Sequence, residues 1–186
     1  MIALLTRTAV FALGVALGAA SYAQTSPPKP ASPAAKAMLN QEDQRFVKEA
    51  GTGGLAEVEL SKIAQKSANA DVKSFADRMV QDHTKANQEL ASIASGLGID
   101  VPKTLDAEHE RMRQKLAGLH GKAFDEQYMR DMVEDHNKTV MLFQTEERSG
   151  QSPELKQFAQ KTLPILQTHQ KMAQELSQKL TTASAR

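Results

Sequence analysis

Three histidines of this sequence stand at corresponding places in amphipathic segments. His83 and His136 each close a repeated phrase, Met-Val-Gln-Asp-His and Met-Val-Glu-Asp-His, at an offset of 53 residues, and a fainter echo includes His169. A repeat on this scale indicates that one supersecondary unit is used more than once. Imidazole nitrogens bind zinc, copper and iron. The repeated unit therefore carries a group that is able to hold a metal ion.

Carboxylates are available on the segment that precedes the repeat. Glu57 lies near its middle on the face expected to point inward, and Glu59 is a neighbour. Residues at mid-helix meet at the centre of a bundle whichever way the helices run. The candidate ligands of one zinc, copper or iron ion are Glu57, Glu59, His83, His136 and His169. Apart from Glu59, we expect their side-chain tips to lie within about 8 Å of one another, because helix axes in bundles are about 8–10 Å apart.

An aspartate precedes each histidine of the repeat, namely Asp82 and Asp135. Each lies about a quarter of a turn aside, and we expect it to orient an imidazole of a neighbouring helix by accepting a hydrogen bond. Ferritin-like enzymes with two iron ions need Glu-x-x-His motifs. Three residues before the histidines stand Val80, Val133 and Leu166 instead, so two-iron chemistry is disfavoured and a single ion remains possible.

A purely structural role fits the same histidines. A buried histidine in a bundle is often hydrogen-bonded to a carboxylate across the seam, where it fixes the register of the helices. Duplication of an ancestral hairpin would copy such a histidine without any metal. Both interpretations stay open. We expect His109, His120 and the pair Glu146-Glu147 to face solvent.

The sequence contains no recognisable catalytic or cofactor-binding motif. It has no cysteine, no Gly-x-Ser-x-Gly turn and no phosphate-binding loop. We therefore assign no catalytic residue and disfavour an enzyme. The absence of cysteine also excludes disulfides and thiolate metal sites.

The periodicity of the chain from residue 41 onward predicts helices throughout. Apolar residues and His83 follow steps of four and three from Val72 to Leu97, which is typical of a helix packed in a bundle. We expect helices at about 42–67 and 70–96, a third that ends at Ser149, and a fourth capped by Ser152. Short joins make each consecutive pair an antiparallel hairpin, and the long connector carries a short amphipathic stretch at 105–119. The fold class is all-α, a ferritin-like four-helix bundle of two hairpins with a long crossover that carries a short helix.

The N-terminal region is predicted to be a signal peptide and a linker. Arg7, an apolar run and the small residues before Ala23 are typical of a secretory signal at 1–23, cleaved after Ala23. Residues 24–40 are rich in proline and alanine, which predicts a disordered linker, and 41–182 form the domain. We expect the mature chain in the periplasm or secreted, without a transmembrane span and without a lipid-modified cysteine.

The charge and composition of the chain limit the classes of partner that we expect. The chain has 23 basic and 22 acidic residues, one basic residue lies in the signal, and aromatic residues make up 4%. With no basic stripe, nucleic-acid binding is not expected. An envelope protein or a second copy of this chain remains a possible partner.

Several motifs resemble the bacterial family called domain of unknown function 4142. They are Gly53-Gly-Leu-Ala-Glu-Val-Glu-Leu-Ser-Lys-Ile-Ala64, Val72-Lys-Ser-Phe-Ala76, the two Asp-His phrases, and Leu163-Pro164 with His169. The resemblance covers about 41–180 and implies an exported, ferritin-like protein, but no established activity. Two functions are consistent with the sequence. One is a non-enzymatic envelope or stress-related protein that binds a partner or has a structural role, and the other is a periplasmic protein that binds one metal ion.

Overall fold

The computed structural model describes residues 41–184, which contain five helices and no strand. The helices are α2 (Gln41–Ala64), α3 (Ala70–Gly96), α4 (Ala107–Ala117), α5 (Gly121–Ser149) and α6 (Pro153–Ser184). The all-α prediction is therefore confirmed for this part of the chain. The predicted signal peptide and linker, residues 1–40, lie outside the described residues. None of the described helices has a stretch long and apolar enough to cross a membrane.

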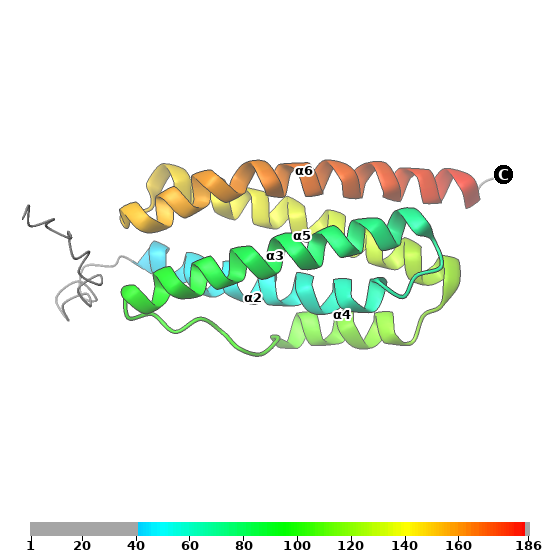
Figure 1. Ribbon diagram of the computed structural model, residues 1–186, viewed down its shortest axis with the longest axis horizontal. Helices are drawn as coiled ribbons and strands as arrows, with labels where there is room; N and C mark the ends of the chain where they lie inside the picture. The colour runs from blue at the N-terminus through cyan, green and yellow to red at the C-terminus, as the bar shows by residue number, and fades with distance from the viewer. Residues whose placement is uncertain (1–40, 185–186) are drawn as a thin grey trace, which may run out of the picture.

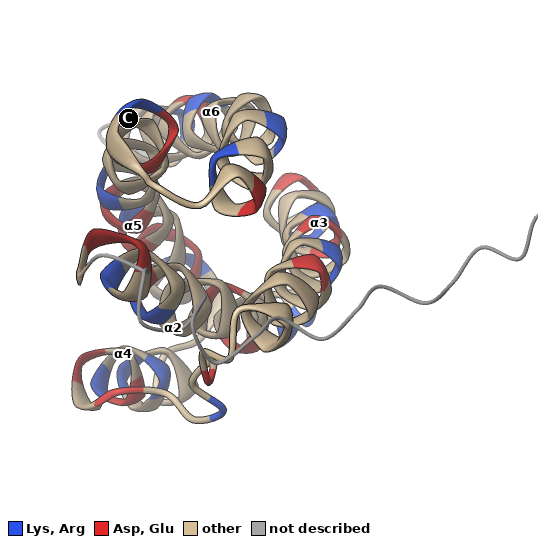
Figure 2. Ribbon diagram, turned by 90° about the vertical axis from the view of Figure 1, so that its left-hand side faces the viewer, with Lys and Arg blue, Asp and Glu red and all other residues tan. Residues whose placement is uncertain are grey.

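Four long helices lie side by side, and the short α4 packs outside them (Figure 1). Helix α3 returns alongside α2, and the connector from residue 97 to α4 then runs back along the assembly, so that α5 has the direction of α3. The most extensive contacts join α2 to α3 and α5 to α6, and smaller ones join α2 to α5 and α3 to α6. Viewed end-on, the four long helices surround a common centre, with α4 beside α2 (Figure 2).

Side chains cap the starts of α3 and α6, and the cap at Ser152 is the one predicted from the sequence. The side chain of Asn69 accepts hydrogen bonds from the backbone N–H groups of Asp71 and Val72 at the start of α3. The Ser152 hydroxyl accepts the N–H of Leu155 at 3.3 Å, and Pro153 occupies the first turn of α6, where its missing N–H costs nothing. These caps set where the two hairpins turn.

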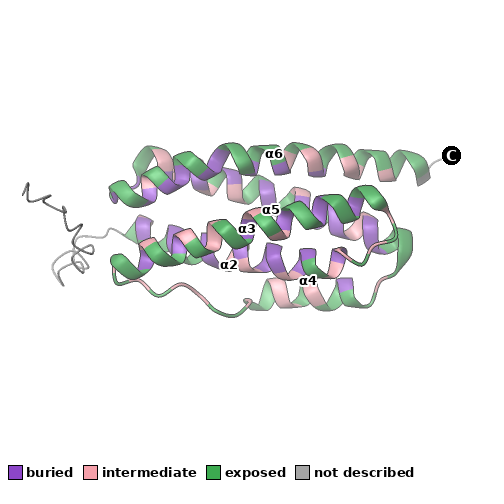
Figure 3. Ribbon diagram, in the orientation of Figure 1, coloured by how far each residue is buried: buried purple, intermediate pink, exposed green. Residues whose placement is uncertain are grey.

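The buried residues line the inner faces of the long helices (Figure 3) and form two apolar clusters. At one end, the ring centroid of Phe46 lies 5.0 Å from that of Phe143 and 6.3 Å from that of Phe158. At the other end, the rings of Phe75 and Tyr128 lie 6.1 Å apart. On each long helix, a buried polar residue stands between the part that enters one cluster and the part that enters the other.

Two glycines near the middle of α2 have different surroundings. A Cβ atom at Gly51 would lie 2.5 Å from Cγ1 of Val101 in the connector, whereas a Cβ atom at Gly53 would meet nothing within 4 Å. Helix α2 runs through both positions without interruption. Gly51 therefore lets the connector pass close to the helix, while Gly53 has no such role.

We predict opposite effects for alanine at these two positions. Gly53→Ala should raise the free energy of unfolding by up to about 1 kcal/mol, because alanine is the better helix former. Gly51→Ala should lower it by about 1–3 kcal/mol, since overpacking displaces the connector. Urea unfolding of both variants beside the wild type measures the effects. An equal stabilisation by the two substitutions would contradict the close packing of the connector on α2.

The expectation that Glu146 faces solvent is wrong. Its side chain is only 1% exposed and lies beside Asp43, whose oxygens accept the backbone N–H groups of Gln151 and Ser152 at 2.8 and 2.9 Å. Burial, and next the negative charges of Asp43 and Glu42, raise the pKa of Glu146 to about 7. The start of α2 covers this end of α5, so Glu146 is buried in spite of its charge.

A pH-dependent stability follows from this raised pKa. In the unfolded chain the pKa of Glu146 returns to about 4.5, so its stabilising contribution is full below pH 4.5 and is lost as pH rises through 7. Glu146→Gln should therefore be more stable than the wild type at pH 8, on the order of 2 kcal/mol, because one pKa unit corresponds to about 1.4 kcal/mol. The difference should shrink at pH 4.5. Urea unfolding at both pH values tests this, with the partly exposed Glu147→Gln as control, and a difference independent of pH would refute it.

Candidate metal centre

Four polar side chains meet midway along the four long helices. Glu57 comes from α2, His83 from α3, His136 from α5 and His169 from α6, and their exposed fractions are 1%, 4%, 0% and 0%. One ring nitrogen from each histidine lies within 4.8 Å of the other two. The heptad positions and the mid-helix placement thus bring together the residues that the sequence indicated.

The Glu57 carboxylate contacts two of the imidazoles. Its Oε2 lies 2.7 Å from Nδ1 of His83, and its Oε1 lies 3.2 Å from Nδ1 of His136. The same Nδ1 of His136 lies 2.9 Å from the carbonyl oxygen of Met132. Because carboxylate and carbonyl oxygens accept hydrogen bonds, each of these Nδ1 atoms donates. Glu57 therefore accepts a hydrogen bond from His83, whereas His136 donates to Met132 and leaves Oε1 of Glu57 without a hydrogen bond among residues 41–184.

An aspartate holds the third imidazole in the same manner. Nε2 of His169 donates to Oδ2 of Asp82 at 2.9 Å, and this contact joins α6 to α3. Asp82 thus orients an imidazole on a neighbouring helix, as its place in the sequence indicated. Asp135 differs, because no hydrogen bond to its Oδ2 is present among residues 41–184 and its side chain lines a separate cavity near His109.

One nitrogen of each imidazole then remains for a shared ligand. These are Nε2 of His83, Nε2 of His136 and Nδ1 of His169. Nε2 of His83 lies 3.2 Å from Nδ1 of His169, and Nε2 of His136 is buried without a hydrogen-bond partner in the described part of the chain. The arrangement offers three nitrogen donors around one point.

The electrostatics of the cluster favour an ionised Glu57 carboxylate and lower the pKa of two imidazoles, those of His136 and His169. Burial alone would raise the pKa of Glu57, but the charges of His83 and His136 reverse this and lower it to about 2. Burial lowers the pKa of His136, and burial followed by repulsion from His83 lowers that of His169 to about 4. Neutral imidazole is the form that binds a metal ion.

Glu59 lies outside the cluster. Its side chain is 39% exposed and accepts a hydrogen bond from Lys62 at 2.8 Å, because a shift of two positions along a helix turns a side chain to a different face. The expectation that His109 faces solvent is also wrong. Its side chain is only 15% exposed, and its Nδ1 lies 2.8 Å from Oδ1 of Asp106. His120 is exposed, as expected.

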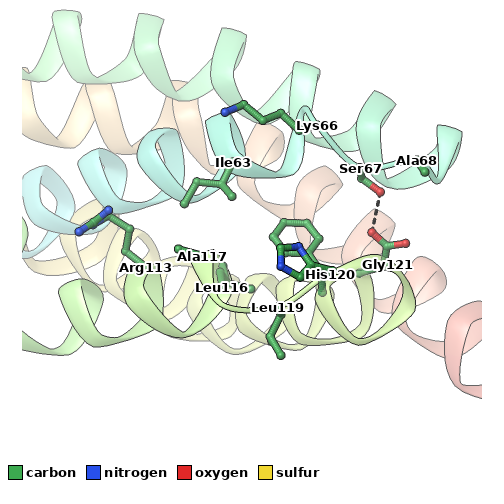
Figure 4. Close-up of a pocket in the computed structure, with 12 residues that line it drawn as sticks. Ile63, Lys66, Ser67, Ala68, Arg113, Leu116, Ala117, Leu119, His120 and Gly121 are labelled. Carbon is green, nitrogen blue, oxygen red and sulfur yellow. Dashed lines mark hydrogen bonds between the residues drawn. The ribbon is translucent and has the colours of Figure 1, made fainter.

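Two cavities differ in their relation to the cluster. One of about 90 Å³ lies between α3 and α6 and is lined by His83 and His169. A larger one, of about 500 Å³, lies where α2 joins α3 and α4 joins α5 (Figure 4). At this larger cavity the Ser67 hydroxyl donates a hydrogen bond to Oδ1 of Asp125 at 2.6 Å. No histidine of the cluster lines the larger cavity. The small cavity therefore leads to the candidate site.

Comparison with known proteins identifies relatives by family and by fold. The family model described as domain of unknown function (DUF4142) matches residues 28–176. The chain is also similar to the crystal structure of a DUF305 fragment from Deinococcus radiodurans, with a TM-score of 0.66 and 15% identity over 76% of this chain and 98% of that chain. At this identity the likeness shows the fold alone. No curated protein matches the sequence.

The two glutamates of α2 make a matched pair for a stability test. Without metal, Glu57→Gln should lower the free energy of unfolding by about 1–3 kcal/mol, because the amide group of glutamine faces an imidazole N–H donor with another donor. Glu59→Gln should change it by less than about 0.5 kcal/mol. Urea unfolding in the presence of a chelator measures both. Equal effects of the two substitutions would contradict the buried hydrogen bond of Glu57.

Proposed function

The chain belongs to the family defined by the domain of unknown function DUF4142, and we propose that it is an exported protein that binds one transition-metal ion at mid-bundle. The family description supplies no activity. The signal-like residues 1–23 support export, and the directions of the helices support a ferritin-like four-helix bundle with a long crossover between its hairpins. The ligands are His83, His136 and His169.

The observation that carries this proposal is the orientation of the three rings. Each imidazole donates its outer N–H to an oxygen of Glu57, Met132 or Asp82. A neutral imidazole has one N–H. When all three rings are neutral, the remaining nitrogens therefore present lone pairs to one another. We call these the inner nitrogens; they are Nε2 of His83, Nε2 of His136 and Nδ1 of His169. Lone pairs repel unless a cation lies between them. A proton or a metal ion at this point removes the repulsion.

The spacing of the inner nitrogens suits a metal ion. Two nitrogens bound to tetrahedral zinc at about 2.0–2.1 Å lie roughly 3.3 Å apart. The inner nitrogens of His83 and His169 lie 3.2 Å apart. One nitrogen from each histidine lies within 4.8 Å of the others, so binding of the third nitrogen would require the rings to move closer together. Copper and iron accept the same ligands.

The carboxylates support the site without entering it. Metal-bound histidines commonly donate their second N–H to a carboxylate, which fixes the ring and makes it a stronger ligand. Glu57 and Asp82 occupy that position here, and their negative charges offset those of a divalent ion. Glu57 is therefore proposed as an orienting residue, in place of the ligand role expected from the sequence.

One observation favours a second candidate function. The 3.2 Å contact between Nε2 of His83 and Nδ1 of His169 is also a hydrogen bond when the cluster retains one extra proton. The histidines would then hold the register of the helices in a non-enzymatic envelope or stress-related protein, whose partner would be another protein or a second copy of the chain. Metal titration separates the two functions.

We predict that the untagged mature protein binds one Zn²⁺, Cu²⁺ or Fe²⁺ ion per chain, measured by isothermal titration calorimetry. The dissociation constant should be tighter than about 10 μM, which corresponds to about 7 kcal/mol. Bound metal should raise the melting temperature, because only the folded state assembles the site. His136→Ala should abolish both the binding and the rise, whereas His120→Ala, at an exposed histidine outside the cluster, should change neither. If His136→Ala merely destabilises the protein and the wild type binds no metal below 10 μM, the structural function replaces the proposed one.

A further inference from the structure

The cavity between α3 and α6 is lined by two histidines of the cluster and by Asp82. Its volume is about 90 Å³, and its lining includes Ala86 and His83 from α3 and Thr162, Ile165 and His169 from α6. Water occupies about 30 Å³ per molecule in the liquid, so this volume suits a few waters or a small anion. His136 does not line the cavity. The cavity therefore meets the cluster on the α3–α6 side.

Among residues 41–184, the group of side chains that could hold a metal ion at this point consists of three histidines and no fourth ligand. The Glu57 carboxylate has its Oε2 2.7 Å from Nδ1 of His83 and its Oε1 3.2 Å from Nδ1 of His136. The Asp82 carboxylate is likewise held by His169 at 2.9 Å. Metal sites that are closed by four protein ligands are structural, whereas sites with three protein ligands keep a position for water or substrate.

These two observations together indicate an open coordination position. Resting on the metal site proposed above, we propose that the bound ion keeps one coordination position that opens into the α3–α6 cavity, where water is exchanged for a small anion. The metal ion supplies the positive charge that attracts the anion. The two walls of the cavity are joined by the ion pair of Lys161 and Glu89, at 2.8 Å, which limits access to small ligands.

Cobalt-substituted protein tests this proposal directly. Co²⁺ accepts the same ligands as zinc and, unlike zinc, reports its coordination in the visible spectrum. Sodium azide added to the 1:1 Co²⁺ protein should produce a saturable spectral change with one azide per cobalt. Metal-free protein should show no such change. The spectrum should return to its starting form when azide is removed by dialysis.

A matched pair of substitutions on α3 locates the open position. Ala86→Leu places a larger side chain in the cavity and should weaken azide binding at least tenfold while Co²⁺ still binds. Ala91→Leu is the same change at an exposed position of α3 that does not line the cavity, and it should leave both affinities unchanged. Ile165→Trp, which fills the cavity from α6, replaces Ala86→Leu if that variant fails to fold.

The possible results separate this proposal from the one on which it rests. Failure of the wild type to bind Co²⁺ would overturn both. Tight Co²⁺ binding with a spectrum that azide does not change would overturn only the open position, and would mean that a protein group such as Glu57 completes the coordination. Azide binding that is equally strong in Ala86→Leu and Ala91→Leu would refute the cavity as its route.

Discussion

The buried carboxylate of Glu57 is the constraint on which the rest of the structure depends. An ionised carboxylate removed from water is tolerated only when donors and compensating charge surround it. Nδ1 of His83 donates to Glu57 at 2.7 Å, and Nδ1 of His136 lies 3.2 Å from its other oxygen, so the carboxylate contacts two other helices. The Asp82 carboxylate then ties His169 to the same layer. All four long helices must therefore meet at one depth, and their lengthwise register follows from this layer.

The polar layer also explains why the apolar core is divided. Leucine, methionine and aromatic side chains in the two clusters would tolerate small adjustments of one helix along another, because apolar contacts have little directional preference. Hydrogen bonds between buried groups do not, since a shift would leave donors and acceptors unpaired. The same four residues consequently fix the register and present three nitrogens to a common point. The structural role and the proposed metal-binding role in this way draw on one arrangement, and a metal ion would occupy a site that the fold already requires.

Much of this arrangement was predictable from local pattern. The steps of four and three placed His83 and its counterparts on inner faces, and their mid-helix positions predicted that they meet. The cap at Ser152 follows from residue chemistry in the first helical turn, and the short joins located the hairpins. Asp82 was expected to orient a histidine of another helix, and it lies 2.9 Å from His169. These features depend on periodicity and spacing, which the sequence contains in full.

The burial of particular polar side chains depended on which other helix packs against each helix face, and the periodicity of one helix does not contain that information. The glycines of α2 left the inner face ambiguous, and only the packed helices place Glu57 inside and Glu59 outside. Glu146 and His109 are polar residues that were expected to face solvent, yet the start of α2 covers one and the packing of α4 buries the other. The orienting role proposed for Glu57 depends on tertiary structure in the same manner, because which imidazole nitrogen faces it depends on ring orientations set by three helices. Sequence thus determined which residues converge, and tertiary structure decided which atoms face one another.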